Sequence, residues 1–229
     1  MQRQLGALFL CGWVAVVVAS WTAGAQDRGP RRADLRGGVE ERSTDGPTYT
    51  AAGELIRPAD YREWAFVTSG VGMTYGPAQP ATGQPAFFDN VFVNRESLRA
   101  FMQTGRWPDK TMFLLEIRRG EVNVSINNGG QTQGEIVALE SAVKDAARFP
   151  ETGWGYFNFG RGGSLAAAVA PLPVTASCYN CHGANTAVEN TFVQFYPTLF
   201  EVAKKMGTVK ATYDPMKKVS RPPAAGSNP

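Results

Sequence analysis

The sequence lacks both a strong excess of charge and a long hydrophobic run. It has 23 basic and 20 acidic residues, a balance that does not favour a nucleic-acid or membrane-surface partner. Its longest apolar run, Leu5–Ala19, falls short of the roughly 20 residues that span a bilayer. Arg3 precedes this run and the small residues Ala23–Ala25 follow it, which is typical of a cleaved secretory signal. We therefore expect residues 1–25 to be a signal peptide and the mature chain to have no membrane span.

Cysteine and histidine are also scarce. Cys11 should leave with the signal, so the mature chain keeps Cys178, Cys181 and a single histidine, His182. An exported protein whose two thiols lie in one motif has no spare cysteine for a structural disulfide. A structural zinc site usually needs four Cys or His ligands, and the mature chain offers three. A thioredoxin-like dithiol would be expected near a βαβ pattern, which the sequence does not show.

Polar segments flank one expected domain. Residues 26–50 are rich in Gly and Arg and lack hydrophobic periodicity, which predicts a flexible leader. Residues 211–229 combine prolines with Gly, Ser and Lys, which predicts a disordered tail. The intervening residues 51–210 are enough to bury one core.

The centre of the chain predicts an α+β fold, mainly an antiparallel sheet with a few helices. Five runs are dense in aromatic and β-branched residues and are bounded by Gly, Pro or Asn, which is typical of strands. These runs are Trp64–Ser69, Ala86–Val93, Thr111–Arg118, Glu135–Val143 and Trp154–Phe159. Helical spacing predicts a helix over Glu96–Thr104 and another over Asn190–Met206, which Pro197 should kink or split.

The segment Cys178–His182 reads Cys-Tyr-Asn-Cys-His, the pattern of c-type haem attachment. In such a site the two thiols add across the haem vinyl groups, and the adjacent imidazole becomes an axial ligand of the iron. Every Cys and His of the expected mature chain lies in this motif, which favours haem attachment over a chance match. The sequence thus predicts one covalent haem c, with His182 as the proximal iron ligand.

A single histidine limits the other side of the iron, because a second histidine ligand cannot come from the same chain. The sixth position is then a methionine, an exogenous ligand or nothing. The methionines of the mature chain are Met73, Met102, Met112, Met206 and Met216. A small electron-transfer cytochrome c is mostly helical with its haem motif near the N-terminus, whereas here a long strand-rich region precedes the motif.

Further motifs resemble the cytochrome P-460 and cytochrome c′-beta family. In order they are Tyr61–Trp64, Phe92–Asn94, Trp107–Asp109, Leu139–Asp145, Trp154–Phe157, the haem motif and Phe192–Pro197. The resemblance covers about residues 61–200. It implies a mainly antiparallel β fold around a five-coordinate haem. Members of this family oxidise hydroxylamine, handle nitric oxide or bind small diatomic ligands, so the resemblance implies one of these activities.

The chain departs from the hydroxylamine-oxidising members of that family. Their lysine that is cross-linked to haem aligns with Leu115, and the nearest lysine, Lys110, falls in a turn. A distal arginine aligns with Asp89. A distal glutamate is retained as Glu140. The resemblance thus implies a distal catalytic role for Glu140 and argues against a lysine cross-link.

Strand alternation gives an independent expectation for the pocket. If Leu115 faces the haem, then Phe113 and Ile117 share its face and form an apolar distal wall. Glu140 would share a face with small residues such as Ala138 and Ala142, which leave room for a ligand. The alternative for Glu140 is an ordinary solvent-facing strand residue.

The sequence therefore predicts a periplasmic monohaem cytochrome that binds or redox-converts small nitrogen ligands such as nitric oxide or hydroxylamine. One alternative is an enzyme, a hydroxylamine oxidase or peroxidase in which Glu140 accepts protons. Others are a non-catalytic nitric-oxide carrier and an electron-transfer protein with Met and His ligands. The expected partners are the small ligand and a redox-partner cytochrome, and the family resemblance adds a homodimer.

Overall fold

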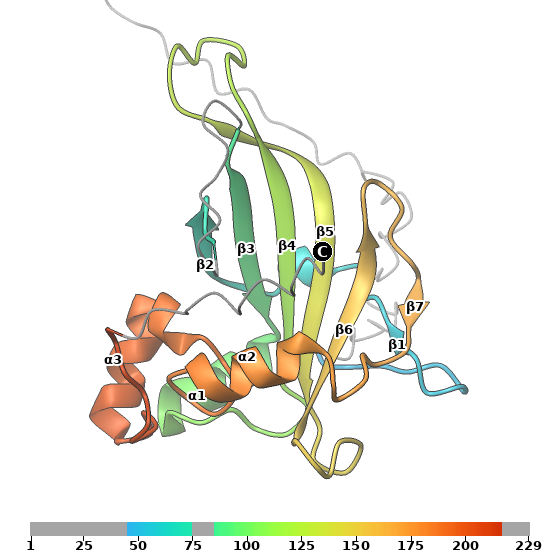
Figure 1. Cartoon of the computed structure of the whole chain (residues 1–229), viewed down its shortest axis with the longest axis vertical. Helices are drawn as coiled ribbons and strands as arrows, with labels where there is room; N and C mark the ends of the chain where they lie inside the picture. The colour runs from blue at the N-terminus through green and yellow to red at the C-terminus, as the bar shows by residue number, and fades with distance from the viewer. Residues whose placement is uncertain (1–44, 75–84, 217–229) are drawn as a thin grey trace, which may run out of the picture. The chain divides into compact units, whose positions relative to one another are not determined.

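A computed structural model describes residues 45–74 and 85–216 of the chain. Five antiparallel strands form its main sheet in the order β2-β3-β4-β5-β6, so strands that follow one another in sequence are neighbours (Figure 1). They are β2 (Ala65–Val71), β3 (Phe87–Val93), β4 (Met112–Glu121), β5 (Thr132–Lys144) and β6 (Trp154–Arg161). A second sheet pairs two short strands, β1 (Leu55–Ile56) and β7 (Ala168–Val169).

Three helices complete the fold, which is therefore α+β with a mainly antiparallel sheet, as predicted. They are α1 (Arg95–Thr104), α2 (Ser177–Asn185) and α3 (Pro197–Met206), together with the 3-10 turns η2 (Tyr61–Glu63) and η3 (Val193–Phe195). Gly105 and Gly207 end α1 and α3 in the left-handed conformation that glycine adopts at low cost. None of the helices in the described ranges is both long and apolar enough to cross a membrane.

Both faces of the main sheet are buried. On one face, the register aligns Ala65, Val93, Phe113, Ala142 and Tyr156 in a row across all five strands. This row belongs to a core that also includes side chains of α1 and α3. The opposite face contributes to a second core, which includes residues of η2 and the short strand β1. Burial on two sides explains the short uninterrupted apolar runs Val91–Val93 of β3 and Met112–Leu115 of β4.

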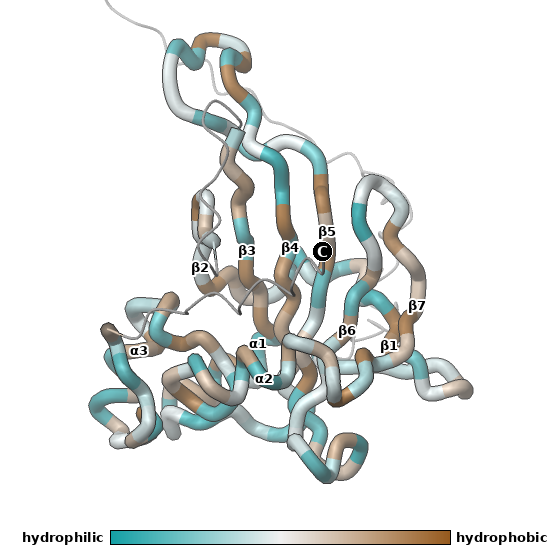
Figure 2. The backbone as a smooth tube through the Cα atoms, in the orientation of Figure 1, coloured by the Kyte–Doolittle hydropathy of each residue, from teal (hydrophilic) through white to brown (hydrophobic). Residues whose placement is uncertain are grey.

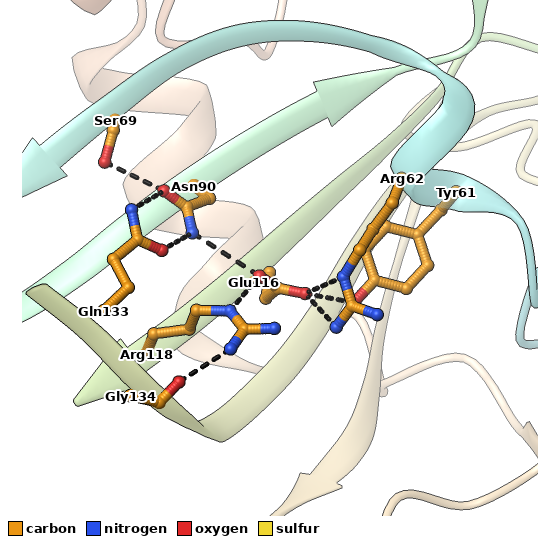
Figure 3. A network of polar contacts seen from close by, with 8 residues as sticks. All are labelled: Tyr61, Arg62, Ser69, Asn90, Glu116, Arg118, Gln133 and Gly134. Atoms are coloured by element: carbon orange, nitrogen blue, oxygen red, sulfur yellow. Dashed lines mark hydrogen bonds and ion pairs between the residues drawn. The ribbon is translucent and has the colours of Figure 1, made fainter.

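A polar network lies within the second face (Figure 3). Glu116 is 2% exposed and accepts hydrogen bonds from Arg62, Arg118 and the hydroxyl of Tyr61. Asn90 joins this network to Gln133 through hydrogen bonds in both directions. A buried carboxylate is costly unless it is paired and hydrogen-bonded, and Glu116 meets both conditions.

The five long strands lie where the sequence predicted them, and so does the first helix. The second predicted helix is wrong at its start: α3 begins at Pro197, not Asn190, because proline favours the first turn of a helix and lacks the N–H that its interior needs. Pro197 thus splits the predicted segment, with η3 before it. Helix α2 was not predicted from the sequence.

The predicted domain boundaries stay a prediction, and residues 1–44 and 217–229 lie outside the described residues. Two described residues of the expected leader nevertheless contact the domain. The Asp45 carboxylate accepts hydrogen bonds from the backbone N–H groups of Arg95 and Glu96 at the start of α1. Tyr49 pairs with Leu55 in an isolated β-bridge. In the expected tail, Tyr213 packs edge-on against Phe200 of α3.

The connection between β4 and β5 extends beyond the neighbouring strands (Figure 1). Apolar residues lie in this connection, visible as brown segments in Figure 2. Ile126 is 94% exposed there, and Val122 and Val124 are also exposed.

Candidate functional site

Helix α2 carries the Cys-x-x-Cys-His motif and buries none of its residues completely. Hydrogen bonds from outside hold its C-terminal end instead. Gln194 donates to the carbonyl of Asn185 at 2.7 Å, and the Lys210 ammonium donates to the carbonyl of Gly183 at 3.0 Å. A cation near the last carbonyls also interacts favourably with the helix dipole. The motif is therefore positioned by later parts of the chain.

The motif faces the main sheet across a cavity of about 260 Å³. Cys178, Cys181 and His182 line one side of it, and both thiols are free. The opposite wall is a second row of the sheet register, with one residue from each strand. This row, which we call the cavity row, consists of Thr68, Val91, Leu115, Glu140 and Asn158.

The His182 ring is oriented by a hydrogen bond. Its Nδ1 lies 2.8 Å from the carbonyl oxygen of Asn190, and since a carbonyl can only accept, Nδ1 carries the proton. Nε2 is then left with the lone pair that an iron ligand needs. Burial lowers the pKa of His182, which favours the neutral imidazole. Both effects prepare this side chain to coordinate a metal.

Aromatic side chains enclose His182. Its ring centroid lies 4.5 Å from that of Tyr156 on β6 and 4.7 Å from that of Phe192. Tyr156 is 4% exposed and lines the cavity, yet its hydroxyl has no hydrogen-bond partner among residues 45–74 and 85–216. Buried hydroxyls are normally satisfied, so this one fits a cavity that receives a ligand with polar atoms.

The predicted distal residues Phe113 and Leu115 both line the cavity. Ile117 follows on the same strand and was expected to share this wall, but it is not among the lining residues. Glu140 pairs with Leu115 in the register and also lines the cavity, with its side chain 32% exposed. The sheet side of the cavity thus combines the apolar side chains of Phe113, Leu115 and Val91 with a carboxylate directly beside Leu115.

A second carboxylate, that of Asp89 on β3, lines the same cavity. Burial raises the pKa of Asp89, and the negative charge of Glu140 raises it further. Glu140 lies 3.6 Å from the guanidinium of Arg161, which is 72% exposed. In the described parts of the chain, no lysine or arginine lines the cavity.

Lys110 lies away from the cavity. It occupies the turn before β4 with a φ of 65° and forms an ion pair with Asp145, which is 2% exposed. A second lysine near this turn, Lys144, is also held by partners of its own. Its ammonium donates a hydrogen bond to the Trp107 carbonyl and forms an ion pair with Glu189, each at 2.7 Å. Neither lysine side chain lines the cavity.

Of the five methionines of the expected mature chain, Met73 alone lines the cavity. Its side chain packs over Gly70, where an added Cβ would lie 2.1 Å from the sulfur, so a larger residue at position 70 would displace the Met73 side chain. Met112 is buried in the other core, and Met102, Met206 and Met216 are exposed. This distribution leaves one methionine within the cavity.

The cavity residues fit a c-type haem. Two free thiols and an imidazole with an available Nε2 share one cavity, with the apolar side chains of Phe113 and Leu115 opposite and an unsatisfied hydroxyl within it. These are the donors that covalent haem attachment and iron coordination require.

Sequence reasoning missed two features of this site. The Tyr156 contact with His182 joins β6 to α2, and no local pattern indicates such a pairing, although Tyr156 lies in one of the family-like motifs. The Asn190 carbonyl that orients His182 is a backbone group, and any residue type supplies one.

Comparison with known proteins agrees with this arrangement. The family model for cytochrome P460 matches residues 58–193, which include the main sheet, the cavity row and the haem motif. No curated protein matches the chain. Because the family model covers more than half of the sequence, the chain belongs to the cytochrome P460 family, whose members are haem proteins.

Proposed function

We propose that this protein is an exported, periplasmic cytochrome with one haem held covalently by Cys178 and Cys181 and coordinated by His182. Its distal site is open and binds or redox-converts small nitrogen ligands such as nitric oxide or hydroxylamine. The observation that carries this proposal is the shared cavity, in which the motif faces the apolar wall of Leu115 and Phe113.

An apolar wall favours a small, weakly polar ligand. Nitric oxide is neutral and needs no base, so binding requires only space and a vacant iron position. Hydroxylamine oxidation would require proton removal, for which Glu140 is the available carboxylate beside Leu115. Since no lysine in the described ranges lines the cavity, the cross-link of hydroxylamine oxidases has no amine to form it. We therefore favour ligand binding over hydroxylamine oxidation as the function of this site.

Visible absorption spectra of the purified holoprotein, with and without nitric oxide, test the proposal. An open site gives a predominantly high-spin ferric spectrum and a shift of the main haem band when nitric oxide is added. A low-spin ferric spectrum that does not respond to nitric oxide contradicts an open site.

The position of Met73 supports one alternative function, electron transfer with Met and His ligands. Replacement of Met73 by leucine separates the two functions, because leucine keeps the volume but has no sulfur. An open site predicts that Met73→Leu leaves the high-spin ferric spectrum unchanged. If Met73 is a ligand, wild type shows a low-spin spectrum with a methionine-to-iron charge-transfer band that the variant loses. Met102→Leu, at an exposed position of α1, is the matched control.

A further inference from the structure

The charged residues that line the cavity have one sign. Asp89 and Glu140 are its two carboxylates, and no lysine or arginine of residues 45–74 and 85–216 lines it. Both project from the sheet face that lies opposite the motif and line the same cavity as His182, so on the proposed function both would lie on the side where an exogenous ligand binds. The unpartnered hydroxyl of Tyr156, which is 4% exposed, independently indicates that this cavity receives a polar group.

The two carboxylates differ in how well they are compensated. Glu140 has the Arg161 guanidinium at 3.6 Å, although that group is mostly exposed and therefore screened by water. Asp89 has no cationic side chain within 4 Å in the described parts of the chain. Its pKa is raised first by burial and then by the negative charge of Glu140 on the same sheet face, so both effects disfavour the ionised form of Asp89. Asp89 is thus the less compensated of the pair.

Resting on the proposed function, we propose that Asp89 and Glu140 make the distal site selective for neutral ligands over anions, with Asp89 as the main determinant. A negative ligand brought to the iron is repelled by both carboxylates, and repulsion is stronger in a cavity than in water. Nitric oxide carries no charge and is unaffected. A protonated amine such as hydroxylammonium is attracted into the cavity, but it must give up a proton, for example to a carboxylate, before its nitrogen could bind the iron. Nitrite and azide are disfavoured.

Equilibrium titration of the ferric holoprotein with sodium azide, and separately with nitric oxide, tests this selectivity at a pH of about 7.5, well above the reference pKa of about 4 for a carboxyl group. We expect Asp89→Asn and Asp89→Leu each to lower the azide Kd by about tenfold, and Glu140→Gln to lower it by about threefold. The nitric-oxide Kd should change by less than about twofold in every variant. Glu135→Gln is the matched control, because Glu135 lies on the same strand as Glu140, outside the cavity, and is 72% exposed.

The outcomes separate this inference from the proposed function. An azide Kd that is unchanged in the Asp89 and Glu140 variants, or a nitric-oxide Kd that shifts as much as the azide Kd, overturns the selectivity while leaving the open site intact. A gain in Asp89→Asn without one in Asp89→Leu also overturns it, because a new amide donor would then explain the effect. A wild-type protein that binds neither ligand overturns both.

Discussion

Cys178 and Cys181 are three positions apart on α2, so their side chains emerge on one face of the helix, toward the cavity. His182 follows directly and is oriented by the Asn190 carbonyl. In the proposed haem site the three side chains would differ in what they contribute, because the thiols would fix the haem covalently whereas the imidazole would coordinate its iron.

Replacement of both cysteines by alanine should abolish covalent attachment. We expect wild-type haem to remain with the polypeptide in acidified acetone, and the haem of Cys178→Ala/Cys181→Ala to pass into the solvent. The absorbance of the protein pellet at the main haem band measures this. A double variant that retains its haem would show that another group holds it.

Lys110 should carry no haem. Its ammonium is paired with Asp145 in the turn before β4, whereas Leu115 occupies the position that faces the cavity. Digestion of the holoprotein and mass spectrometry of the haem peptides should find haem on the Cys178–His182 peptide and on no peptide containing Lys110. Haem on a Lys110 peptide would restore the hydroxylamine-oxidase hypothesis, and Lys110→Arg would then remove it.

At the scale of the elements, the polar network holds β2, β3, β4 and β5 together behind the cavity wall (Figure 3). Glu116 is its centre. Burial acts to raise the pKa of Glu116, but the hydrogen bonds from Arg118, Tyr61 and Arg62 outweigh burial and lower it. A carboxyl whose folded pKa is lowered stabilises the fold above its unfolded pKa of about 4.3, and this stabilisation is lost as the pH falls through the folded pKa.

Glu116→Gln should therefore destabilise the protein by about 2 kcal/mol at neutral pH and reduce the loss of stability on acidification. Urea unfolding at a series of pH values between about 3 and 7 measures both effects. Glu121→Gln, on an exposed position of the same strand, is the control and should match wild type. If the free energy of unfolding of Glu116→Gln falls with pH as steeply as that of wild type, the polar network does not cause the loss of stability in acid.

The sequence predicted the elements that have a strong local pattern. All five long strands were found because aromatic and β-branched runs such as Phe87–Val93 are bounded by turn residues. The two-residue strands β1 and β7 were not found, since two residues give no periodicity. Helix α2 was not found because it has no apolar stripe, with Asn180, Gly183 and Asn185 among its residues.

In the candidate site, too, the residues with a local sequence pattern were predicted and those brought together by distant contacts were not. The motif is local, and strand alternation was enough to place Leu115 and Phe113 on one face. The contacts that give the cavity its character are not local. Tyr156 meets His182 across 26 positions of sequence, and Met73 reaches the cavity from just beyond the end of β2. Only the folded chain brings these residues together.

At the scale of the whole molecule, the proposed export to the periplasm requires that a signal peptide be removed from the chain. The apolar run and small residues at the N-terminus predict cleavage near Gln26. We expect the protein recovered from the periplasmic fraction to begin at or near Gln26 and to contain haem, as measured by N-terminal sequencing and intact mass. Substitution of Ala23 and Ala25 by bulky residues should block cleavage. A haem protein that still begins at Met1 would contradict the signal.

The β4–β5 connection is a suitable place to attach a label or a surface to the protein. None of its residues lines the cavity, and Ile126 at its exposed tip is almost fully accessible to solvent. Exposed loop tips tolerate insertions and attached groups better than buried segments do. Ile126→Cys would let the holoprotein be immobilised on an electrode or labelled with a dye from the side remote from the haem motif, provided that the two native thiols hold haem as proposed.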